Sequence, residues 1–368
     1  MTTPLTRRTA LLAGAGALGA AALAAPAIAQ DRRKVTMVYG VQTIDGSSEG
    51  FFASIPIGLG FYAEEGLDVD LQTMAGAGAA DNVLASGQAQ IATHGTGGLF
   101  GAVGHGLPMK AFICQVPDDF TSIGVLKSSK IETVEQLKGK TIGVSAVNGA
   151  PVLLAKAVMR RLGWDLSKDV QFLAVGTALP ALDALRRGQV DALVLWDTIF
   201  ALFEFHGAEF RYFRPDPFPQ IGFTHATYAL NATIEKDPEL IAKMSRALAK
   251  SLVIMASAPQ PELAKLHFKV FPASKPTGMG DADVMRLDKM RYDARVSFMR
   301  LKQRVFDRTE KLGDVSDEAV AGLRDLLFNG GEIPKALPVS DYFTRQFLPE
   351  MNNIDFPALI ARGRALKV

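Results

Sequence analysis

The residues best suited to hold a small molecule lie in six short loops, each of which follows a segment with the pattern of a β-strand. The loops cover residues 42–50, 75–80, 94–98, 145–151, 176–180 and 196–198. They are rich in Gly, Ser, Thr and Ala, small residues that let the main chain approach a ligand closely. None of them contains Lys or Arg, so a polyanion would find only helix N-termini and hydroxyl groups to hold it. We therefore expect a ligand that is not a polyanion.

The chain lacks the usual patterns for zinc or dithiol chemistry. It contains neither HExxH nor CxxC, and its one cysteine, Cys114, lies in an apolar run where we expect a buried, inert thiol. The five histidines are too far apart in sequence to form a metal pair on one helix: His94, His105, His206, His225 and His267. We expect no metal, no cofactor and no catalytic residue.

Several loop residues have two interpretations. His94 lies in a Gly-rich turn, where it either donates to a ligand or satisfies local main-chain groups. Trp196 ends an apolar run and either packs in the core or stacks on a ligand. Asp197 is expected to cap the helix that follows. Phe51 and Phe52 are adjacent, so at helical spacing we expect one to pack inward and the other to face a cleft or solvent.

Strand and helix patterns alternate along the chain. Strands are predicted near residues 35–39, 67–71, 90–93, 141–145 and 170–175. The apolar stretch 51–65 predicts a helix, which Gly66 ends as a left-handed cap. Alternation of this kind builds a parallel sheet with helices on both faces.

The pattern recurs after about 100 residues, because LASGQAQIA at residues 84–92 is echoed by LRRGQVDAL at 185–193. Two copies indicate two similar α/β lobes, since a solenoid needs more copies to close a core. Proline-containing joins bracket the second copy, at residues 115–121 and 214–220. The chain would then return to the first lobe, and its charged run 283–311 is expected to form an amphipathic surface helix.

The first 29 residues have the composition of an export signal. Arg7 and Arg8 precede an uncharged stretch rich in Ala and Gly, and Ala27-Ile28-Ala29 forms a small-x-small cleavage pattern. The TRRTALL string resembles a twin-arginine translocation motif. No cysteine lies near the cleavage pattern, which argues against a lipoprotein, and the stretch is shorter than the ~20 strongly apolar residues of a membrane span. We expect a soluble periplasmic protein.

The charge balance excludes one function class. The chain has 40 Lys+Arg and 38 Asp+Glu, a formal net charge of +2. Both excess charges are Arg7 and Arg8 of the export signal, so the remainder is formally neutral. A nucleic-acid binder needs clustered basic residues to contact phosphates, and we therefore expect no nucleic acid as partner.

Three segments resemble a known family. They are IGLGFYAEEGLDV at residues 57–69, LASGQAQIA at 84–92 and LKGKTIGV at 137–144. Together with the export signal, they resemble the periplasmic solute-binding proteins of ABC importers. The similar branch binds nitrate, sulfonates, taurine or thiamine-pyrimidine precursors.

The resemblance implies an α/β protein with the two-lobed type II periplasmic-binding-protein fold, in which each lobe is a mostly parallel sheet flanked by helices. Residues 30–118 and 222–368 would form lobe 1 with the C-terminal helices, and residues 119–221 would form lobe 2. The lobes of a monomer would close by hinge bending on a small-molecule ligand held in the cleft between them. The protein would then dock on the permease of an ABC transporter.

The resemblance also implies a set of ligand-binding residues. Carried over by position, they are Gln42, Ser47, Ser48, Phe51, His94, Gly95, Thr96, Asn148, Gly149, Ala150, Thr177 and Trp196. Sulfonate binders of the family often hold the anion with a basic side chain, and the loops identified above have none. The expected ligand is therefore a neutral, aromatic or heterocyclic solute, or a monoanion.

Two other functions stay open. The first is an enzyme on the same fold, similar to pyrimidine-precursor synthases, which carry a cysteine-rich motif, or to a desulfinase, which carries a nucleophilic Cys in the first-lobe loop. Residues 40–50 contain no Cys, so we expect the chain not to be an enzyme. The second is a ligand sensor for a membrane kinase, which sequence alone does not separate from a transporter component.

Overall fold

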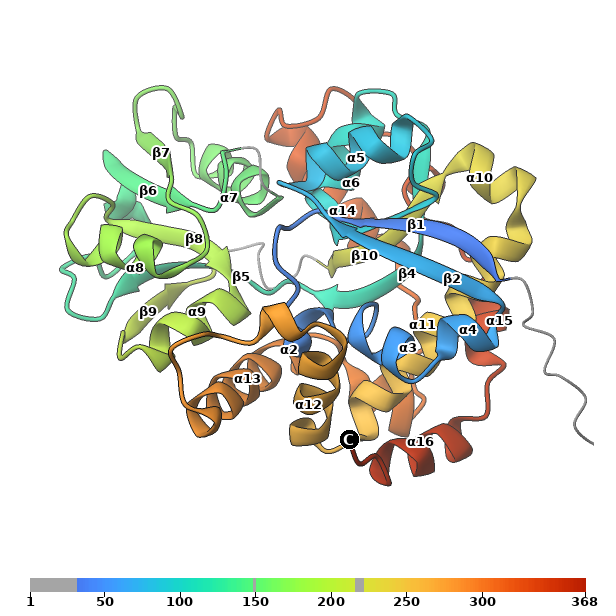
Figure 1. The fold of residues 1–368 in the computed structure, drawn as a ribbon. Helices are drawn as coiled ribbons and strands as arrows, with labels where there is room; N and C mark the ends of the chain where they lie inside the picture. The colour runs from blue at the N-terminus through green and yellow to red at the C-terminus, as the bar shows by residue number, and fades with distance from the viewer. Residues whose placement is uncertain (1–31, 148–149, 216–221) are drawn as a thin grey trace, which may run out of the picture.

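The structure, a computed structural model, describes residues 32–147, 150–215 and 222–368. Its strands form two five-stranded sheets with helices packed against them (Figure 1). We call the part built on the first sheet lobe 1 and the part built on the second sheet lobe 2. The strands of lobe 1, in spatial order, are β2 (Leu67–Thr73), β1 (Arg33–Tyr39), β3 (Ile91–Gly95), β10 (Gly222–Leu230) and β4 (Met109–Asp118). Those of lobe 2 are β7 (Val170–Ala174), β6 (Lys140–Val144), β8 (Ala192–Trp196), β5 (Thr121–Leu126) and β9 (Phe210–Phe213).

The two sheets share one topology. In lobe 1, β1 is parallel to β2 and β3, whereas β10 is antiparallel to β3 and β4. In lobe 2, β6 is parallel to β7 and β8, whereas β5 is antiparallel to β8 and β9. Four strands of each sheet therefore run in the same direction, as predicted, and one strand, β10 or β5, runs against them and makes the sheet mixed.

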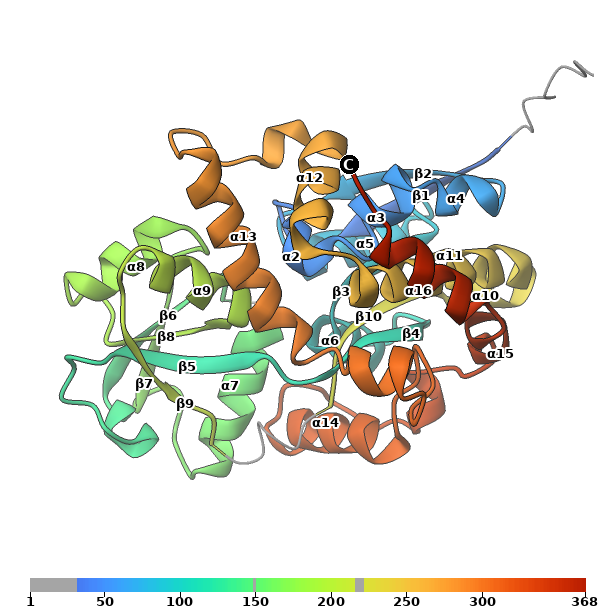
Figure 2. The same ribbon diagram turned by 90° about the horizontal axis from the view of Figure 1, so that it is seen from below.

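Helices cover the sheets and extend lobe 1. Lobe 1 contains α2 (Gly46–Glu49), α3 (Ser54–Gly58), α4 (Phe61–Glu64), α5 (Ala77–Ala85), α6 (Thr96–Gly104), α10 (Asn231–Lys236), α11 (Pro238–Ser257), α12 (Gln260–Val270), α14 (Asp317–Asn329), α15 (Leu348–Asn352) and α16 (Phe356–Arg364). Lobe 2 contains α7 (Ala150–Arg161), α8 (Leu179–Arg186) and α9 (Asp197–Phe205). Helix α13 (Asp281–Val296) lies against α9 of lobe 2 and α2 of lobe 1, as Figure 2 shows from below.

Repeated glycines explain why the two halves of the sequence fold alike. Gly66 and Gly163, which follow α4 and α7, have φ of 73° and 81°. Gly87 and Gly188 have φ of 77° and 67°, and they end the helices that precede β3 and β8. A side chain would cost about 1–2 kcal/mol in this left-handed conformation. The glycines therefore end each helix at the same point of the strand–helix–strand unit.

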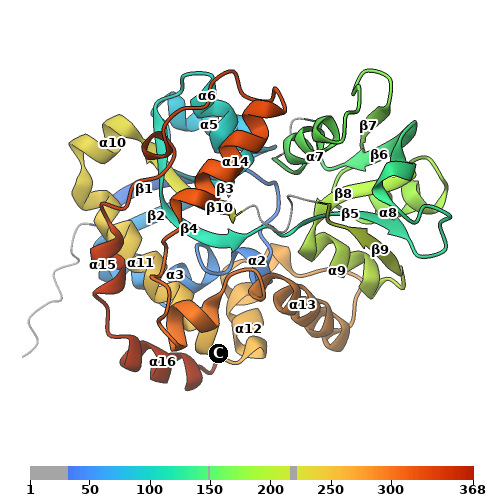
Figure 3. The ribbon, with the colours of Figure 1, turned by 180° about the vertical axis from the view of Figure 1, so that it is seen from behind.

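The hydrophobic core continues from one lobe into the other. One buried cluster joins Val38 and Tyr228 of lobe 1 to Val144 and Val158 of lobe 2. It passes through α7, which packs against α6 and α14 (Figure 3). A second cluster lies beneath α11, which buries Leu240, Leu248 and other apolar residues along its length. The lobes therefore contact each other on two sides, through α7 and through α13.

The helix predicted over residues 51–65 is interrupted. Residues 50–53 form a turn, and α3 and α4 follow as separate short helices. Gly60, between them, has a φ of 79°, which breaks the regular hydrogen-bond ladder. The cap predicted at Gly66 is confirmed by its positive φ.

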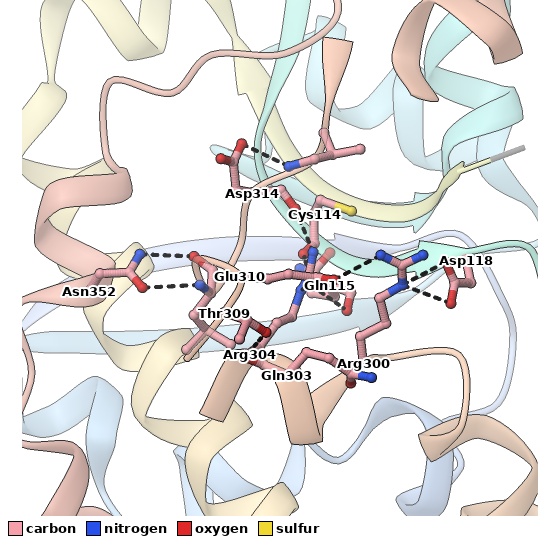
Figure 4. Close-up of polar contacts among 12 residues, drawn as sticks. Cys114, Gln115, Asp118, Arg300, Gln303, Arg304, Thr309, Glu310, Asp314 and Asn352 are labelled. Carbon is pink, nitrogen blue, oxygen red and sulfur yellow. Dashed lines mark hydrogen bonds and ion pairs between the residues drawn. The ribbon is translucent and has the colours of Figure 1, made fainter. Parts of the chain in front are cut away.

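The charged run 283–311 is not one surface helix. Helix α13 ends at Val296, and a short π-helical turn follows over Lys302–Phe306. Arg304 of this turn is 2% exposed and donates to the carbonyl oxygen of Cys114 at 3.0 Å. Arg300 pairs with Asp118 at 3.0 Å (Figure 4). The run folds back because two of its arginines satisfy groups at the end of β4.

Parts of the sequence-based account lie outside the described residues. These parts are the export signal at residues 1–29 and most of the second join, residues 216–221. In the part of the chain that the structure covers, no helix has both the length and the apolar composition needed to span a membrane. The lobe boundaries at residues 118/119 and 221/222 stay a prediction.

Candidate functional site

Buried polar side chains gather where the two lobes meet. Strand β1 ends at Tyr39 before α2, β8 ends at Trp196 before α9, and β4 crosses into β5 through Asp119 and Phe120. Helix α13 packs against both α2 and α9 at this point (Figures 1 and 2). We call the following side chains the interlobe cluster: Tyr39, Asp45, Ser48, Glu49, Asp119, Asp197, His225, Arg291 and Arg295.

On the lobe 1 side, Glu49 is the centre of the hydrogen bonding. The Tyr39 hydroxyl group donates to its Oε1 at 2.9 Å, and the main-chain N–H of Asp45 donates to its Oε2 at 2.6 Å. The Asp45 carboxylate accepts from the N–H of Ser47 at 2.9 Å and so caps α2. Glu49 is 6% exposed, and burial, reinforced by the nearby Asp45 charge, raises its pKa to about 7.

Two arginines of α13 join α2 to α9. Arg291 pairs with Asp45 at 2.8 Å. One turn later, Arg295 donates to both carboxylate oxygens of Asp197, at 2.8 and 2.6 Å, and its guanidinium group lies 3.9 Å from the centroid of the Phe120 ring. Arg295 and Asp197 are both almost fully buried. The i, i+4 spacing places both arginines on one face of α13, so a single helix contacts both lobes.

Asp197 differs from the sequence-based expectation. The residue in the N-cap position of α9 is Trp196, and Asp197 is the first residue of the helix. Its carboxylate accepts from the N–H of Thr198 at 2.8 Å and binds Arg295. The expected cap is wrong because a guanidinium group from a helix about 100 residues away competes for the same oxygens.

Asp119 is buried at the crossing between the lobes. Its Oδ1 accepts from the N–H of Thr121 at 3.1 Å, and its Oδ2 has no hydrogen-bond partner among the described residues. The Arg214 guanidinium group is 3.6 Å from Oδ2 and donates to the Asp119 main-chain carbonyl. Burial raises the pKa of Asp119 to about 7.

His225 of β10 lies on an aromatic platform in lobe 1. Its ring stacks on Phe52 at 6.0 Å with an interplanar angle of 14° and meets Phe51 edge-on at 6.0 Å. Burial, together with the positive charge of Arg295, lowers the pKa of His225 well below its usual value, so the ring is neutral. Its Nδ1 has no hydrogen-bond partner within the described parts of the chain.

The platform corrects the expectation for the two phenylalanines. Phe51 is 1% and Phe52 is 0% exposed, so neither faces solvent. They lie in the turn between α2 and α3 rather than in a regular helix. Both rings can therefore point into the same core, against Tyr39 and His225.

His94 is engaged within the protein. Its Nε2 is 2.9 Å from Asp81 Oδ1, its Nδ1 is 2.9 Å from the carbonyl oxygen of Gly95, and its ring meets Tyr228 edge-on. Both ring nitrogens are thus satisfied locally, which is the second of the two interpretations drawn from the sequence. Thr96 is also buried, and its hydroxyl group donates to the carbonyl oxygen of Phe223.

The remaining predicted residues fall into three groups. Ser47 and Ser48 are buried in α2, and half-buried Trp196 packs against apolar clusters of both lobes. Gln42 is exposed in the loop after β1, and Thr177 is half-buried between β7 and α8. Ala150 begins α7, and Asn148 and Gly149 lie outside the described residues. The structure therefore brings Ser47, Ser48, Phe51 and Trp196 to the interlobe cluster, whereas Gln42 is exposed and His94 is bonded elsewhere.

Of the nine cluster members, only Ser48 is among the predicted ligand-binding residues. The members that the sequence did not predict as ligand-binding are Tyr39, Asp45, Glu49, Asp119, Asp197, His225, Arg291 and Arg295. Tyr39 is the last residue of a predicted strand, and Asp119 belongs to a predicted join. His225 and Arg295 come from segments far along the chain. The available signal was the pair Arg291 and Arg295, because i, i+4 arginines on an otherwise mixed-charge helix can bind carboxylates on one side.

Residues 46–50 read GSSEG and match the GxSxG pattern of hydrolase nucleophiles. In such enzymes the serine sits on a sharp turn directly between a strand and a helix, within reach of a histidine. Here Gly40–Asp45 separate β1 from α2, and Ser48 lies inside α2. Its hydroxyl group has no hydrogen-bond partner among the residues described. The match therefore lacks the geometry of a nucleophile and its base.

A cavity of about 390 Å³ lies elsewhere, where α4, α11 and α16 of lobe 1 meet. The charged groups around it pair with one another: Glu65 with Arg246 at 2.7 Å and with Lys250 at 2.9 Å, and Glu64 with Lys250 at 3.1 Å. None of the residues predicted to bind a ligand lines this cavity. We therefore place the candidate site at the interlobe cluster.

Solved structures of known proteins share this architecture. A protein of Bordetella bronchiseptica RB50 has a TM-score of 0.68 at 19% identity, covering 88% of this chain and 98% of that one. The periplasmic aliphatic sulphonate binding protein SsuA of Escherichia coli has a TM-score of 0.60 at 16% identity, covering 84% and 91%. The desulfurization enzyme DSZB has a TM-score of 0.56 at 15% identity, covering 87% and 99%. These likenesses show the two-lobed fold of the periplasmic binding proteins, as the sequence predicted.

The sequence then places the chain within that class. The NMT1/THI5-like family matches residues 56–262, more than half of the chain, and the chain belongs to this family. A Haemophilus influenzae protein named for thiamine biosynthesis is 28% identical over 135 residues, which are 37% of this chain and 42% of that protein. The chain thus matches less than half the length of this relative.

Proposed function

We propose that the protein is the periplasmic substrate-binding component of an ABC-type importer. It captures one small organic solute between its lobes and delivers the solute to a membrane permease. The observation that carries this proposal is the interlobe cluster, in which groups from both sheets converge: Glu49 and His225 from lobe 1, and Asp197 from lobe 2. The family match and the export signal predicted at residues 1–29 support the same function.

Hinge closure is supported by the short connection between the sheets. β4 passes into β5 through Asp119 and Phe120 alone. Rotation of one lobe against the other would change dihedral angles at this crossing and would also shift the contacts that α7 and α13 make between the lobes. A ligand that touches both sides of the interlobe cluster would stabilise the closed arrangement, because it binds that arrangement better than an open one.

The charges around the cluster favour a solute without strong negative charge. Arg291 and Arg295 are already paired with Asp45 and Asp197. An anion would have to compete with these carboxylates for the guanidinium groups in a buried environment, where breaking an ion pair is costly. This keeps the preference for a neutral, aromatic or heterocyclic solute over a sulfonate, although proteins of similar fold bind sulfonates.

An enzyme on the same fold is the second candidate, since the desulfurization enzyme DSZB shares the architecture. Cys114 does not support thiol catalysis here, because its side chain is buried and burial raises its pKa to about 11. A thiol with that pKa is protonated near neutral pH and is a poor nucleophile. A ligand-sensing role would use the same binding site and differs only in the partner.

A thermal-shift screen of aromatic acids, pyrimidines, sulfonates and nitrate tests the proposal. We expect at least one small organic solute to raise the melting temperature of the purified protein, because a ligand that binds only the folded state stabilises it. Mass spectrometry of each stabilising compound after incubation should recover it unchanged. Consumption of the compound would favour the enzyme, and stabilisation by sulfonates alone would contradict the charge preference.

A further inference from the structure

The interlobe cluster and its surroundings contain more carboxyl groups than cationic groups. The carboxyl groups are Asp45, Glu49, Asp119, Asp197 and Asp288. The guanidinium groups are Arg214, Arg291 and Arg295. The two imidazoles nearby add no positive charge, since burial lowers the pKa of both His225 and His267. The region therefore has an excess of acidic groups, with no separate cation to hold an anionic ligand among the side chains described here.

The carboxyl groups of this region differ in whether an arginine lies close to them. Asp45 and Asp197 each have an arginine within 2.8 Å. Among the described residues, Glu49 forms no close ion pair; its oxygens accept from the Tyr39 hydroxyl group and the Asp45 N–H, and Arg295 acts on it from a greater distance. Asp119 has its nearest guanidinium nitrogen at 3.6 Å from Oδ2. Arg295 acts electrostatically on Glu49 and lies over the ring of Phe120, the residue next to Asp119.

Four buried polar atoms of the cluster have no hydrogen-bond partner among the described residues. One is the Nε donor of Arg291, whose guanidinium group is already paired with Asp45. The other three belong to nearly fully buried residues: Ser48 Oγ, Asp119 Oδ2 and His225 Nδ1. The three residues are 1%, 1% and 6% exposed. A buried polar atom without a partner is costly, and a buried carboxylate most of all. A solute that brings N–H donors and a positive charge would remove that cost, whereas an anion would add repulsion from the carboxylates.

We propose that the interlobe cluster selects a small cationic solute with several N–H donors, such as an amidine or a protonated amine, and that Glu49 and Asp119 are the residues that set this specificity. The inference rests on the proposed binding function and changes the expected charge of its ligand from neutral to positive. It replaces the choice between a neutral solute and a monoanion with a definite sign of charge.

Four compounds that share one ring test the proposal: benzamidine, benzamide, benzoate and benzenesulfonate. Thermal shift and isothermal titration calorimetry of the purified protein at pH 8 should give binding in the order benzamidine, then benzamide, with no binding of the two anions. Stronger binding of benzoate or benzenesulfonate than of benzamidine would overturn the proposal. Absence of binding by all four would overturn it as well.

Variants then test the two specificity residues. Glu49→Gln and Asp119→Asn keep the size of the side chain and remove its charge, so each should weaken benzamidine binding about tenfold or more, with little change for benzamide. Asp183→Asn on the exposed side of α8 is the matched control and should change neither. If both variants bind benzamidine with wild-type affinity, Glu49 and Asp119 do not set the specificity. If Glu49→Gln does not fold, the affinity of Asp119→Asn alone tests the proposal.

The outcomes also separate this inference from the function on which it rests. If a broad solute screen yields an anionic or uncharged ligand with 1:1 binding, the charge preference fails and the binding function stands. If no solute in the screen binds, the binding function itself fails.

Discussion

The Arg295–Asp197 pair is a buried ion pair that links α13 to lobe 2. Both side chains are almost fully buried, and the guanidinium group makes two hydrogen bonds to the carboxylate and lies over Phe120. A buried pair of this kind contributes little when both partners are present, because their desolvation offsets their attraction. Removal of one partner leaves an uncompensated buried charge, which should destabilise the folded protein.

Arg295→Ala is expected to lower the free energy of unfolding by about 3–5 kcal/mol, because Asp197 would stay buried without its partner. Lys289→Ala is the control on the same helix, since Lys289 and Asp293 are 60% and 58% exposed and a pair so exposed contributes at most about 1 kcal/mol. Denaturant titration of the two variants provides the comparison. If Arg295→Ala and Lys289→Ala lower the free energy of unfolding equally, the Arg295–Asp197 pair does not behave as a buried ion pair.

Glu49 predicts a pH dependence of stability. Its pKa is about 7 in the folded protein, against 4.5 for the ordinary side chain. Between these values the folded state holds a proton that the unfolded state has released, so stability falls as the pH rises through this window and stays lower above it. The loss is on the order of 3 kcal/mol.

Glu49→Gln should remove this contribution, so its advantage over wild type should grow between pH 5 and pH 8 in urea titrations. Asp119 and Asp288 have raised pKa values of the same kind, and they stay in the variant as an internal reference. A constant difference between the two proteins across this range would refute a raised pKa at Glu49.

At the level of elements, the sequence predicted the strand–helix alternation because glycines mark the same points in both halves. Gly87 and Gly188 occur in matching sequence contexts, and both adopt the positive φ that ends a helix before a strand. These are local signals, and local signals can be read from sequence. The sequence does not predict that β5 and β10 are antiparallel, because β5 pairs with residues 69–90 positions away and β10 with residues 104–136 positions away.

The site residues divide in the same way, into those that local sequence signals predict and those that only long-range contacts bring to the site. Ser47, Ser48 and Trp196 follow predicted strands and reach the interlobe cluster. Arg295 was assigned to a surface helix, and what buries it is Asp197, a residue of the other lobe. The basic groups near the site were therefore absent from the loops, and only the fold reveals that α13 supplies them.

Gly60 and Gly78 provide a paired test at the element scale. Gly60 has a φ of 79°, whereas Gly78 lies within α5 with ordinary helical geometry, and an added Cβ would meet open space at both positions. Gly60→Ala should destabilise the protein by about 1–2 kcal/mol, since alanine is strained in the left-handed region. Gly78→Ala should stabilise it by about 0.4–1 kcal/mol. Thermal unfolding measures both, and destabilisation of similar size in the two variants would contradict the assigned conformations.

For the whole molecule, Trp196 offers a reporter of lobe movement. It is one of two tryptophans and packs against apolar clusters of both lobes, whereas Trp164 belongs to a single cluster away from α13. Binding of a stabilising solute should change the tryptophan fluorescence of wild type and of Trp164→Phe. The change should disappear in Trp196→Phe, and its persistence there would show that the lobes do not rearrange around Trp196.

The central claim is that the two lobes bind one solute and leave it chemically unchanged. Native mass spectrometry of the purified protein, incubated with a mixture of small solutes, tests this most directly. The account predicts a 1:1 complex whose released solute has the mass of the compound supplied. The absence of any complex, or the release of a compound with a different mass, would contradict it.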